Sequence, residues 1–488
     1  MATHPFEIIV GLEVHVQLLT ESKLFCSDGT KFGQPPNTLV SPISIGMPGV
    51  LPVMNRRALE LAIKAGLALQ CQIARFTKWD RKHYYYPDLP KNYQISQYDM
   101  PFATEGYLDV DVEGKTTKVR LIRVHLEEDA GKNLHDDHGG DSLVDLNRAG
   151  MPLIEIVSYP DIRSAAEAGA YLEKLRTLMR DLDVSDCEMQ EGSLRCDANV
   201  NIAITKEGKT YKTPIVEVKN LNSIKMVEKS ITYEAGRQYD QWEKDGKVIG
   251  QAPKQTRGWD EARGVTRPQR EKEEEADYRY FPEPDLVPVV ITEEMLARIK
   301  GEVGESSQQR KDRYRDQLGL SEYNASVLVD KGRGVADYFD ALMSHDIDAK
   351  TAANWVINDV LAHSTGRIKV MHDLAVEPSS LAELIKLVKG NKLNLNDARE
   401  RVLREMISTG KDASTIVQEL GLEVVVDTAA IEAIVDTVLA DMSKVVDDFR
   451  SGKGKALGAL VGQVMKRSQG KFPPALVNEI LNKKLGVS

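Results

Sequence analysis

Apolar and polar residues alternate along a segment near the start of the chain. In residues 11–18 (GLEVHVQL), the apolar positions alternate with Glu13, His15 and Gln17. Alternate side chains of a strand point to opposite faces, so this segment predicts a strand with one apolar and one polar face. The same alternation recurs in residues 119–128, 153–157, 194–202 and 216–219. Several strands that each bury one face predict a mainly antiparallel sheet.

Helices interrupt these strands and then replace them. Asn55, Ser164 and Ser223 each precede an amphipathic run and are expected to cap a helix. Residues 251–276 are polar and aperiodic, which predicts a long loop. From Thr292 onward the pattern is almost wholly helical. A chain of 488 residues is too long for one core, so several domains are expected.

The composition is that of an ordinary globular protein without an overall charge for binding polyanions. The formal net charge is −10, so any nucleic-acid surface must be local. The four cysteines form no CxxC pair, which is typical of free thiols in a reducing compartment. No apolar run approaches the length of a membrane span, and the segment before the first strand leaves no room for a targeting signal. We therefore expect a cytoplasmic protein with no membrane partner.

The polar faces of the strands carry candidate metal ligands. Glu13, His15, Glu128 and Glu155 all lie on apolar-backed strands. Carboxylates with one imidazole suit a divalent cation: the oxygens favour Mg²⁺, and the histidine also suits Mn²⁺ or Zn²⁺. Each residue has an ordinary alternative, such as a paired core carboxylate at Glu155 or a solvated strand end at Glu128. The residues alone leave a metal-assisted enzyme and this structural alternative open.

Other motifs carry less chemistry. His135 and His138 flank two aspartates in a glycine-rich polar loop, where a solvated turn is the expected structure. The chain has no GxxxxGK[ST] motif and no GxGxxG motif after a strand. Any use of ATP would therefore need an unusual site.

Long motifs give the chain a specific resemblance. In order and nearly end to end, it resembles the B subunits of glutamyl-tRNA(Gln)/aspartyl-tRNA(Asn) amidotransferases. The supporting stretches are Gly11–Leu18, Lys82–Tyr98, Val124–Lys132, Asp145–Val157, Gly192–Ile202, Val216–Ser223, Glu274–Leu286 and Leu460–Lys466.

The resemblance implies a two-step reaction on mischarged tRNA(Gln) or tRNA(Asn). ATP phosphorylates the side-chain carboxylate of the esterified Glu or Asp, and ammonia then displaces phosphate. The ammonia comes from glutamine hydrolysed by an amidase A subunit, and a small C subunit completes a heterotrimer. Cations that neutralise the transferring phosphoryl group fit this chemistry. A non-catalytic tRNA-binding scaffold is the alternative, and no DNA partner is expected. An unrelated metal-dependent hydrolase would not explain the helical C-terminal third.

Matching motif to motif assigns two sets of residues by resemblance. The catalytic set comprises the metal ligands His15, Glu128 and Glu155, with Glu13 lining the same site. The second set, expected beside the ATP phosphates or the ammonia path, comprises Arg195, Asp197 and Lys219. The implied cofactors are ATP and Mg²⁺, with Mn²⁺ as an alternative.

One departure from the family concerns zinc. Many relatives carry a Cys-Pro-x-Cys motif where this chain has Ser41 and Ser44, and only Cys26 remains of a second cysteine pair. Because a structural zinc needs four good ligands, we expect no structural zinc.

These patterns together predict an α+β protein of three domains. A large antiparallel-sheet cradle domain, which would be catalytic, spans residues 1–292, a helical domain spans 293–410, and a small helical tail domain spans 411–488. Residues 445–488 contain eight basic and three acidic side chains, a local balance of +5. Since the family's tail reaches the body of the tRNA, we expect this tail to bind tRNA phosphates.

Overall fold

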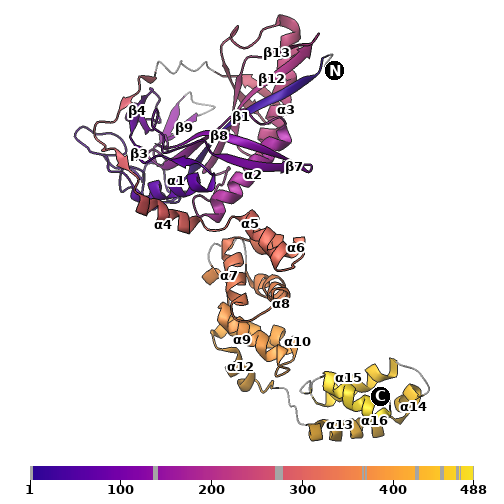
Figure 1. Cartoon of the computed structure of the whole chain (residues 1–488). Helices are drawn as coiled ribbons and strands as arrows, with labels where there is room; N and C mark the ends of the chain where they lie inside the picture. The colour runs from indigo at the N-terminus through magenta and orange to yellow at the C-terminus, as the bar shows by residue number, and fades with distance from the viewer. Residues whose placement is uncertain are drawn as a thin grey trace. The chain divides into compact units, whose positions relative to one another are not determined.

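The chain divides into two compact units, Met1–Ser306 and Ser307–Ser488 (Figure 1). The computed structural model describes residues 4–135, 141–269, 278–364, 368, 371–423, 428–450, 455–468, 472 and 474–486.

An eleven-stranded sheet organises the first unit. Its main order is β16-β15-β14-β12-β1-β11-β8-β6-β2, with β13 paired to β12 and β7 paired to β8. All neighbouring strands are antiparallel except the parallel pair β14 and β15. The predicted antiparallel sheet is therefore confirmed. Its strands are β1 (Phe6–Gln17), β2 (Gln72–Ile73), β6 (Ala103–Thr104), β7 (Tyr107–Val112), β8 (Lys115–Glu128), β11 (Pro152–Ser158), β12 (Leu194–Lys206), β13 (Lys209–Lys212), β14 (Val216–Leu221), β15 (Gln255–Asp260) and β16 (Val265–Pro268).

Three smaller sheets accompany the large one. The three-stranded sheet has the order β17-β4-β5, and the others are the pairs β9-β10 and β3-β18. Their bounds are β3 (Phe76–Thr77), β4 (Asp80–His83), β5 (Tyr93–Ser96), β9 (Lys132–His135), β10 (Ser142–Asp145), β17 (Phe281–Pro282) and β18 (Val289–Val290).

Three helices begin at the predicted caps. The side chains of Asn55, Ser164 and Ser223 accept hydrogen bonds from the first turns of α1 (Arg56–Ala68), α2 (Ala165–Asp181) and α3 (Ile224–Asp245). Such caps satisfy backbone N–H groups that have no partner within the helix. Figure 1 shows α2 and α3 beside the large sheet, and they share a core with its apolar face. The fourth helix, α4 (Glu293–Val303), packs against α1.

The burial pattern explains why the strands alternate. Leu12, Val14 and Val16 of β1 are almost fully buried in the core, together with Leu172 and Leu175 of α2. The polar residues between them therefore lie on the opposite face of the sheet. This second face carries the candidate site.

One prediction for the first unit needs correction. The expected loop over residues 251–276 is wrong in part, because β15 and β16 form there; β15 pairs with the distant β14, a contact that local periodicity does not encode. The first compact unit extends to Ser306, since α4 packs on α1; a domain boundary after residue 292 remains a prediction.

The second unit is helical and contains two hydrophobic cores. The first core includes Leu328, Phe339 and Leu384, and the second includes Ile431 and Leu481. The helices are α5 (Ser307–Asp312), α6 (Glu322–Asp330), α7 (Arg333–Met343), α8 (Ala349–Trp355), α9 (Pro378–Lys389), α10 (Leu395–Asp397), α11 (Leu403–Thr409), α12 (Ala413–Glu419), α13 (Thr428–Asp441), α14 (Ser443–Arg450), α15 (Lys455–Arg467) and α16 (Pro474–Leu485), with π-helical turns at Arg313–Gln317, Val356–Val360 and Ala398–Val402 and 3₁₀ turns at Leu361–His363 and Met371–Asp373.

Helix α12 belongs to the first core of the second unit, so the tail core begins after it. Ala413, Ile416 and Val417 are buried in the first core of the second unit, and α12 packs against α9. The tail core is instead built from α13 to α16. Residues 413–419 therefore pack with the helical domain and not with the predicted tail. None of the described helices is long and apolar enough to cross a membrane.

Candidate active site

The polar face of the large sheet aligns ionisable residues from neighbouring strands. His15 of β1 lies opposite Glu155 of β11 and opposite Arg195 of β12. Glu155 in turn lies opposite His125 of β8. Because directly paired residues in antiparallel strands project their side chains to the same face, these groups form one row across four strands.

Five side chains form a compact group, called here the acid cluster: Glu13, His15, His125, Glu127 and Glu155. The Nε2 atom of His15 lies 3.3 Å from Glu155 Oε2, 3.7 Å from Glu127 Oε1 and 3.9 Å from Glu13 Oε1. The Nε2 atom of His125 lies 3.4 Å from Glu127 Oε2 and 3.8 Å from Glu155 Oε2. Glu155 is therefore shared between the two imidazoles.

His125, Glu127 and Glu155 of the acid cluster are buried, whereas Glu13 and His15 are partly exposed. Burial and neighbouring charges shift the pKa values of Glu13, His15, Glu127 and Glu155. Burial opposes ionisation of Glu155, but the two histidines outweigh it and hold its pKa well below the ordinary value. Burial likewise opposes ionisation of Glu127, yet the hydrogen bond from His125 lowers its pKa. Burial disfavours the imidazolium of His15, but Glu155 and Glu127 raise its pKa. Glu13 is different: burial and the nearby charge of Glu155 raise its pKa.

The ligand atoms of the acid cluster suit a divalent cation. One ligand atom each from Glu13, His15 and Glu155 lies within 4.8 Å of the others, and the same holds for His125, Glu127 and Glu155. Carboxylate oxygens with imidazole nitrogens are donors for Mg²⁺ or Mn²⁺. The residues present therefore fit the expected metal.

Lys82 is a neighbour of the acid cluster that the sequence analysis did not single out. It lies on β4, in the small three-stranded sheet, and its pKa is raised: burial acts against its charge, but Glu127 and Glu155 stabilise it. Its Nζ atom also lies 5.1 Å from the ring centroid of Tyr278. The sequence did contain a signal for Lys82, because this residue is the first of the motif Lys82–Tyr98. No local pattern, however, indicated that it would lie near Glu155 of β11.

Asp197 and Lys219 lie beside the acid cluster and contact each other. Lys219 Nζ forms an ion pair with Asp197 and lies 3.2 Å from Glu217 Oε1. Burial works against the lysine charge, but Asp197 and Glu217 raise its pKa. Asp197 and Glu217 also group with Glu13 as potential metal ligands. The ammonium group of Lys219 already pairs with two carboxylates of this set, Asp197 and Glu217.

Arg195 is bound to a different carboxylate. Its Nη2 atom donates to Asp129 Oδ1 at 2.9 Å, and Gln17 donates to Asp129 Oδ2 at 3.0 Å. Arg148 adds a second cation 3.5 Å from the same carboxylate. Burial opposes the charge of Asp129, but these arginines lower its pKa. The guanidinium of Arg195 is therefore held at the edge of the polar face.

The structure places Glu128 outside the acid cluster. Its Oε1 atom accepts a hydrogen bond from the backbone N–H of Ile95 at 2.9 Å, and it forms a buried ion pair with Lys91. Neighbouring residues of a strand point to opposite faces, so Glu127 and Glu128 of β8 cannot both face His15. Glu127, and not Glu128, therefore faces His15; the assignment of Glu128 to a metal remains a prediction.

The loop that lacks the family's cysteines is held by a carboxylate. Asp28 Oδ2 accepts a hydrogen bond from the backbone N–H of Ser41 at 2.9 Å. The Ser44 hydroxyl donates to the Ser41 carbonyl at 3.0 Å. Burial acts against ionisation of Asp28, but hydrogen bonds from Ser44, Ser41 and Cys26 lower its pKa. Of the other candidate motif, His135 ends β9, whereas His138 lies outside the described residues.

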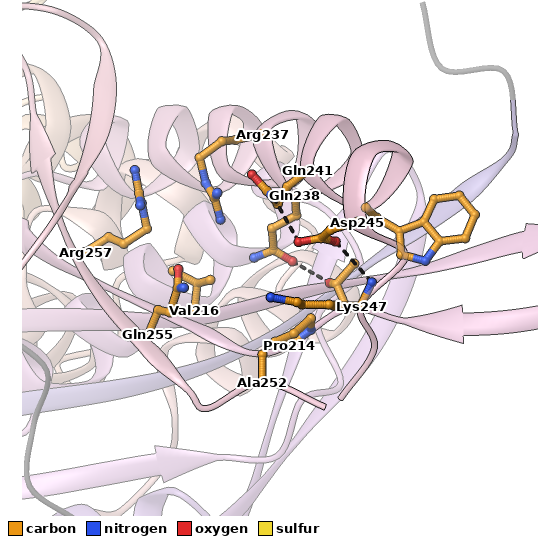
Figure 2. Close-up of a pocket in the computed structure, with 12 residues that line it drawn as sticks. Pro214, Val216, Arg237, Gln238, Gln241, Asp245, Lys247, Ala252, Gln255 and Arg257 are labelled. Carbon is orange, nitrogen blue, oxygen red and sulfur yellow. Dashed lines mark hydrogen bonds between the residues drawn. The ribbon is translucent and has the colours of Figure 1, made fainter. Parts of the chain in front are cut away.

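A separate cavity of about 290 Å³ lies on the α3 side of the sheet. Figure 2 shows Arg237 and Gln241 projecting from α3, with Val216 and Arg257 on the strands below. Arg237 is paired with the buried Glu234 through contacts as short as 2.6 Å. Glu217 alternates with Val216 and therefore lies on the opposite face, so this cavity does not open into the acid cluster.

Comparison with known proteins gives matches along nearly the whole chain. Residues 8–297 match the family model described as the GatB/GatE catalytic domain, and residues 337–485 match the GatB domain. Three relatives are named as B subunits of aspartyl/glutamyl-tRNA(Asn/Gln) amidotransferases. The protein from Moorella thermoacetica is 50% identical over 98% of this chain and 100% of its own length. Those from Rhodopirellula baltica and Caldanaerobacter subterraneus are each 47% identical, over 97% and 98% of this chain and 96% and 99% of their own lengths.

Proposed function

Because the chain belongs to the family of aspartyl/glutamyl-tRNA amidotransferase B subunits, we propose that it converts mischarged tRNA to its amidated form at the acid cluster. The substrates are Glu-tRNA(Gln), Asp-tRNA(Asn) or both. ATP activates the side-chain carboxylate of the esterified amino acid by phosphorylation, and ammonia from glutamine then forms the amide.

The acid cluster is the observation that supports placing the reaction at this part of the sheet. It brings three carboxylates and two imidazoles together on one face of the sheet, and Glu127 and Glu155 are buried and ionised. Buried carboxylates without a bound cation are costly, and their presence is typical of a metal or phosphate site.

We propose that His15, Glu155 and Glu13 hold Mg²⁺, or Mn²⁺ in its place, with Glu127 beside them. When bound, the cation neutralises charge on the transferring phosphoryl group. His15 must lose its proton to serve as a ligand, and Glu155 is already ionised. Glu128, the ligand expected by resemblance, can join them only by leaving Lys91.

The surrounding cations position the anionic reactants. The charge of Lys82 is stabilised by Glu127 and Glu155, and it would supply positive charge where a carboxylate and a phosphate meet. Arg195, Asp197 and Lys219 border the same face and remain our candidates for contacts to the ATP phosphates or the ammonia path. Hydrogen-bonded groups of this kind lower the free energy of a developing negative charge without reorganising.

The remaining parts of the assembly are proposed from the resemblance to the family. We propose that this B subunit works in the cytoplasm with an amidase A subunit, which releases the ammonia, and with a small C subunit. The tail core, built from α13 to α16, is proposed to contact the body of the tRNA.

The test is transamidation by the reconstituted three-subunit complex. Glu-tRNA(Gln) and Asp-tRNA(Asn) are supplied separately, with ATP, Mg²⁺ and glutamine, and the amidated product is measured. Product formation that requires ATP supports the proposal. Binding of mischarged tRNA without product, in a complex that still hydrolyses glutamine, would favour the non-catalytic scaffold.

A further inference from the structure

A pair of stacked tyrosines lies on the surface beside the acid cluster. Tyr98 follows β5 and Tyr280 precedes β17; their ring centroids are 4.0 Å apart at an interplanar angle of 12°. Tyr98 is 45% exposed, whereas Tyr280 is only partly exposed. The pair therefore offers a flat aromatic surface to solvent.

The inner ring of this pair lies beside Lys82, the neighbour of the acid cluster. Pairing of β17 with β4 places Tyr280 next to Lys82. Burial raises the pKa of the Tyr280 hydroxyl to about 12; the charge of Lys82 opposes this shift, and the charges of Glu127 and Glu155 add to it. Tyr278, whose ring lies over the Lys82 ammonium, packs edge to face on Tyr280 with the ring centroids 6.1 Å apart. The stacked pair is thus contiguous with the site.

The position of the outer ring is fixed by its backbone. The N–H of Tyr98 donates a hydrogen bond to Asp80 Oδ2 at 3.0 Å, and Asp80 is buried. Lys78 forms ion pairs with both Asp80 and Asp99, on either side of Tyr98. An aromatic surface held in this way can bind a flat ligand with little loss of conformational entropy.

We propose that Tyr98 and Tyr280 stack the terminal base of the tRNA 3′ end. This inference rests on the proposed function: the reacting carboxylate belongs to an amino acid esterified to the terminal ribose. A path of about nine covalent bonds joins that carboxylate to the terminal base, so the base stays near the acid cluster when the carboxylate reaches it. Proteins commonly bind unpaired nucleotides by stacking them on exposed aromatic side chains.

ATP also contains an adenine ring, but the tRNA base fits this surface better. A free nucleotide is usually held in a concave pocket that encloses most of its surface. Tyr98 is instead nearly half exposed, which suits a strand that passes over the ring and continues away from the protein. The kinetic experiment below distinguishes the adenine of ATP from the terminal base of the tRNA.

The first measurement is steady-state transamidation by the reconstituted complex. Tyr98→Ala is expected to raise KM for mischarged tRNA about tenfold, the size expected for loss of one base stack, with a small change in kcat. Tyr98→Trp retains a stacking surface and should restore KM. Tyr323→Ala removes an equally conspicuous tyrosine, 71% exposed on α6, and should change nothing. A raised KM for ATP with an unchanged KM for tRNA would overturn the proposal.

The second measurement compares binding of uncharged tRNA with and without its terminal adenosine. The wild-type complex should lose affinity when this nucleotide is removed. The Tyr98→Ala complex, which already lacks the stacking ring, should bind tRNA with and without the nucleotide almost equally well. Equal losses in both complexes would overturn the stacking assignment. Because binding needs no catalysis, this comparison remains decisive even for a wild-type complex that forms no amide, a result that would count against the proposed function alone.

Discussion

His15 lies directly opposite Glu155 across β1 and β11, and its Nε2 atom is 3.3 Å from Glu155 Oε2. Glu155 belongs to two of the three groups of possible metal ligands among the described residues, and His15 belongs to one of these two. Each proposed role of the polar face therefore depends on the register of these two strands.

Variants of the neighbouring residues Glu127 and Glu128 test which of the two lies at the metal site. The geometry favours Glu127, and the resemblance to the family favours Glu128. Glu127→Gln should lower transamidation about 100-fold or more, because it removes a carboxylate beside the metal, while glutamine hydrolysis continues. Glu128→Gln removes the charge partner of the buried Lys91 and should mainly lower the unfolding temperature. Assays of both variants below their unfolding temperatures check this. The reverse ranking would return Glu128 to the metal site.

Lys82 should be needed for catalysis because of its charge. Lys82→Met removes the cation beside Glu127 and Glu155 and is expected to lower kcat about 100-fold. Lys118→Met is the matched control, because Lys118 is exposed and also lies over a tyrosine ring, 4.0 Å from the centroid of Tyr107. Equal activity of the two variants would remove Lys82 from the site.

The stability of the metal-free protein should depend on the protonation of His15. Its pKa is raised from 6.5 in the folded protein, so the stabilisation from its charged form is fully present below pH 6.5 and is lost as the pH rises through the raised value. The unfolding temperature in a chelating buffer should therefore fall over this range. His15→Gln should flatten the dependence, whereas His372→Gln, at an exposed histidine, should leave it intact. An unchanged slope in His15→Gln would contradict the assignment.

The purified protein should contain no stoichiometric zinc. The loop carries Ser41 and Ser44, and neutral hydroxyls are poor zinc ligands. The loop is instead tied to Asp28, which accepts the Ser41 N–H. Elemental analysis checks the metal content, and one tightly bound zinc per chain would disprove the prediction. Asp28→Ala should lower the unfolding temperature, because it removes this hydrogen bond.

Removal of the tail core should weaken tRNA binding more than chemistry. The deletion should begin at residue 428, because a deletion from 411 would also remove Ala413, Ile416 and Val417 from the helical core. We expect KM for mischarged tRNA to rise about tenfold and the salt dependence of binding to decrease, since phosphate contacts are lost.

Two basic side chains of the tail already form ion pairs within it, which reduces the charge available for tRNA. Arg467 and Lys484 are paired with Asp441 and Asp436, which precede the basic segment 445–488. Unchanged affinity and salt slope in the truncated complex would show that the tail charges are only solvated or internally paired. Glutamine hydrolysis measured without tRNA serves as the control and should change little.

Local order could be predicted from the sequence because its causes are local. The alternation around Glu13 and His15 follows from the geometry of a strand, and Asn55, Ser164 and Ser223 begin helices because their side chains accept N–H groups a few residues away. The long motifs likewise sufficed to identify the family. These features need no knowledge of which distant segments meet.

The tertiary structure alone decided which charged groups meet. A shift of one residue in strand register moves every side chain to the other face, so the sequence could not choose between Glu127 and Glu128 as the neighbour of His15. The charge of Lys82 acts on Glu155 only because a separate small sheet lies beside the large one, and β15 joins the large sheet through its pairing with the distant β14. Contacts between distant segments depend on chain crossings and packing, which no local pattern of residues encodes.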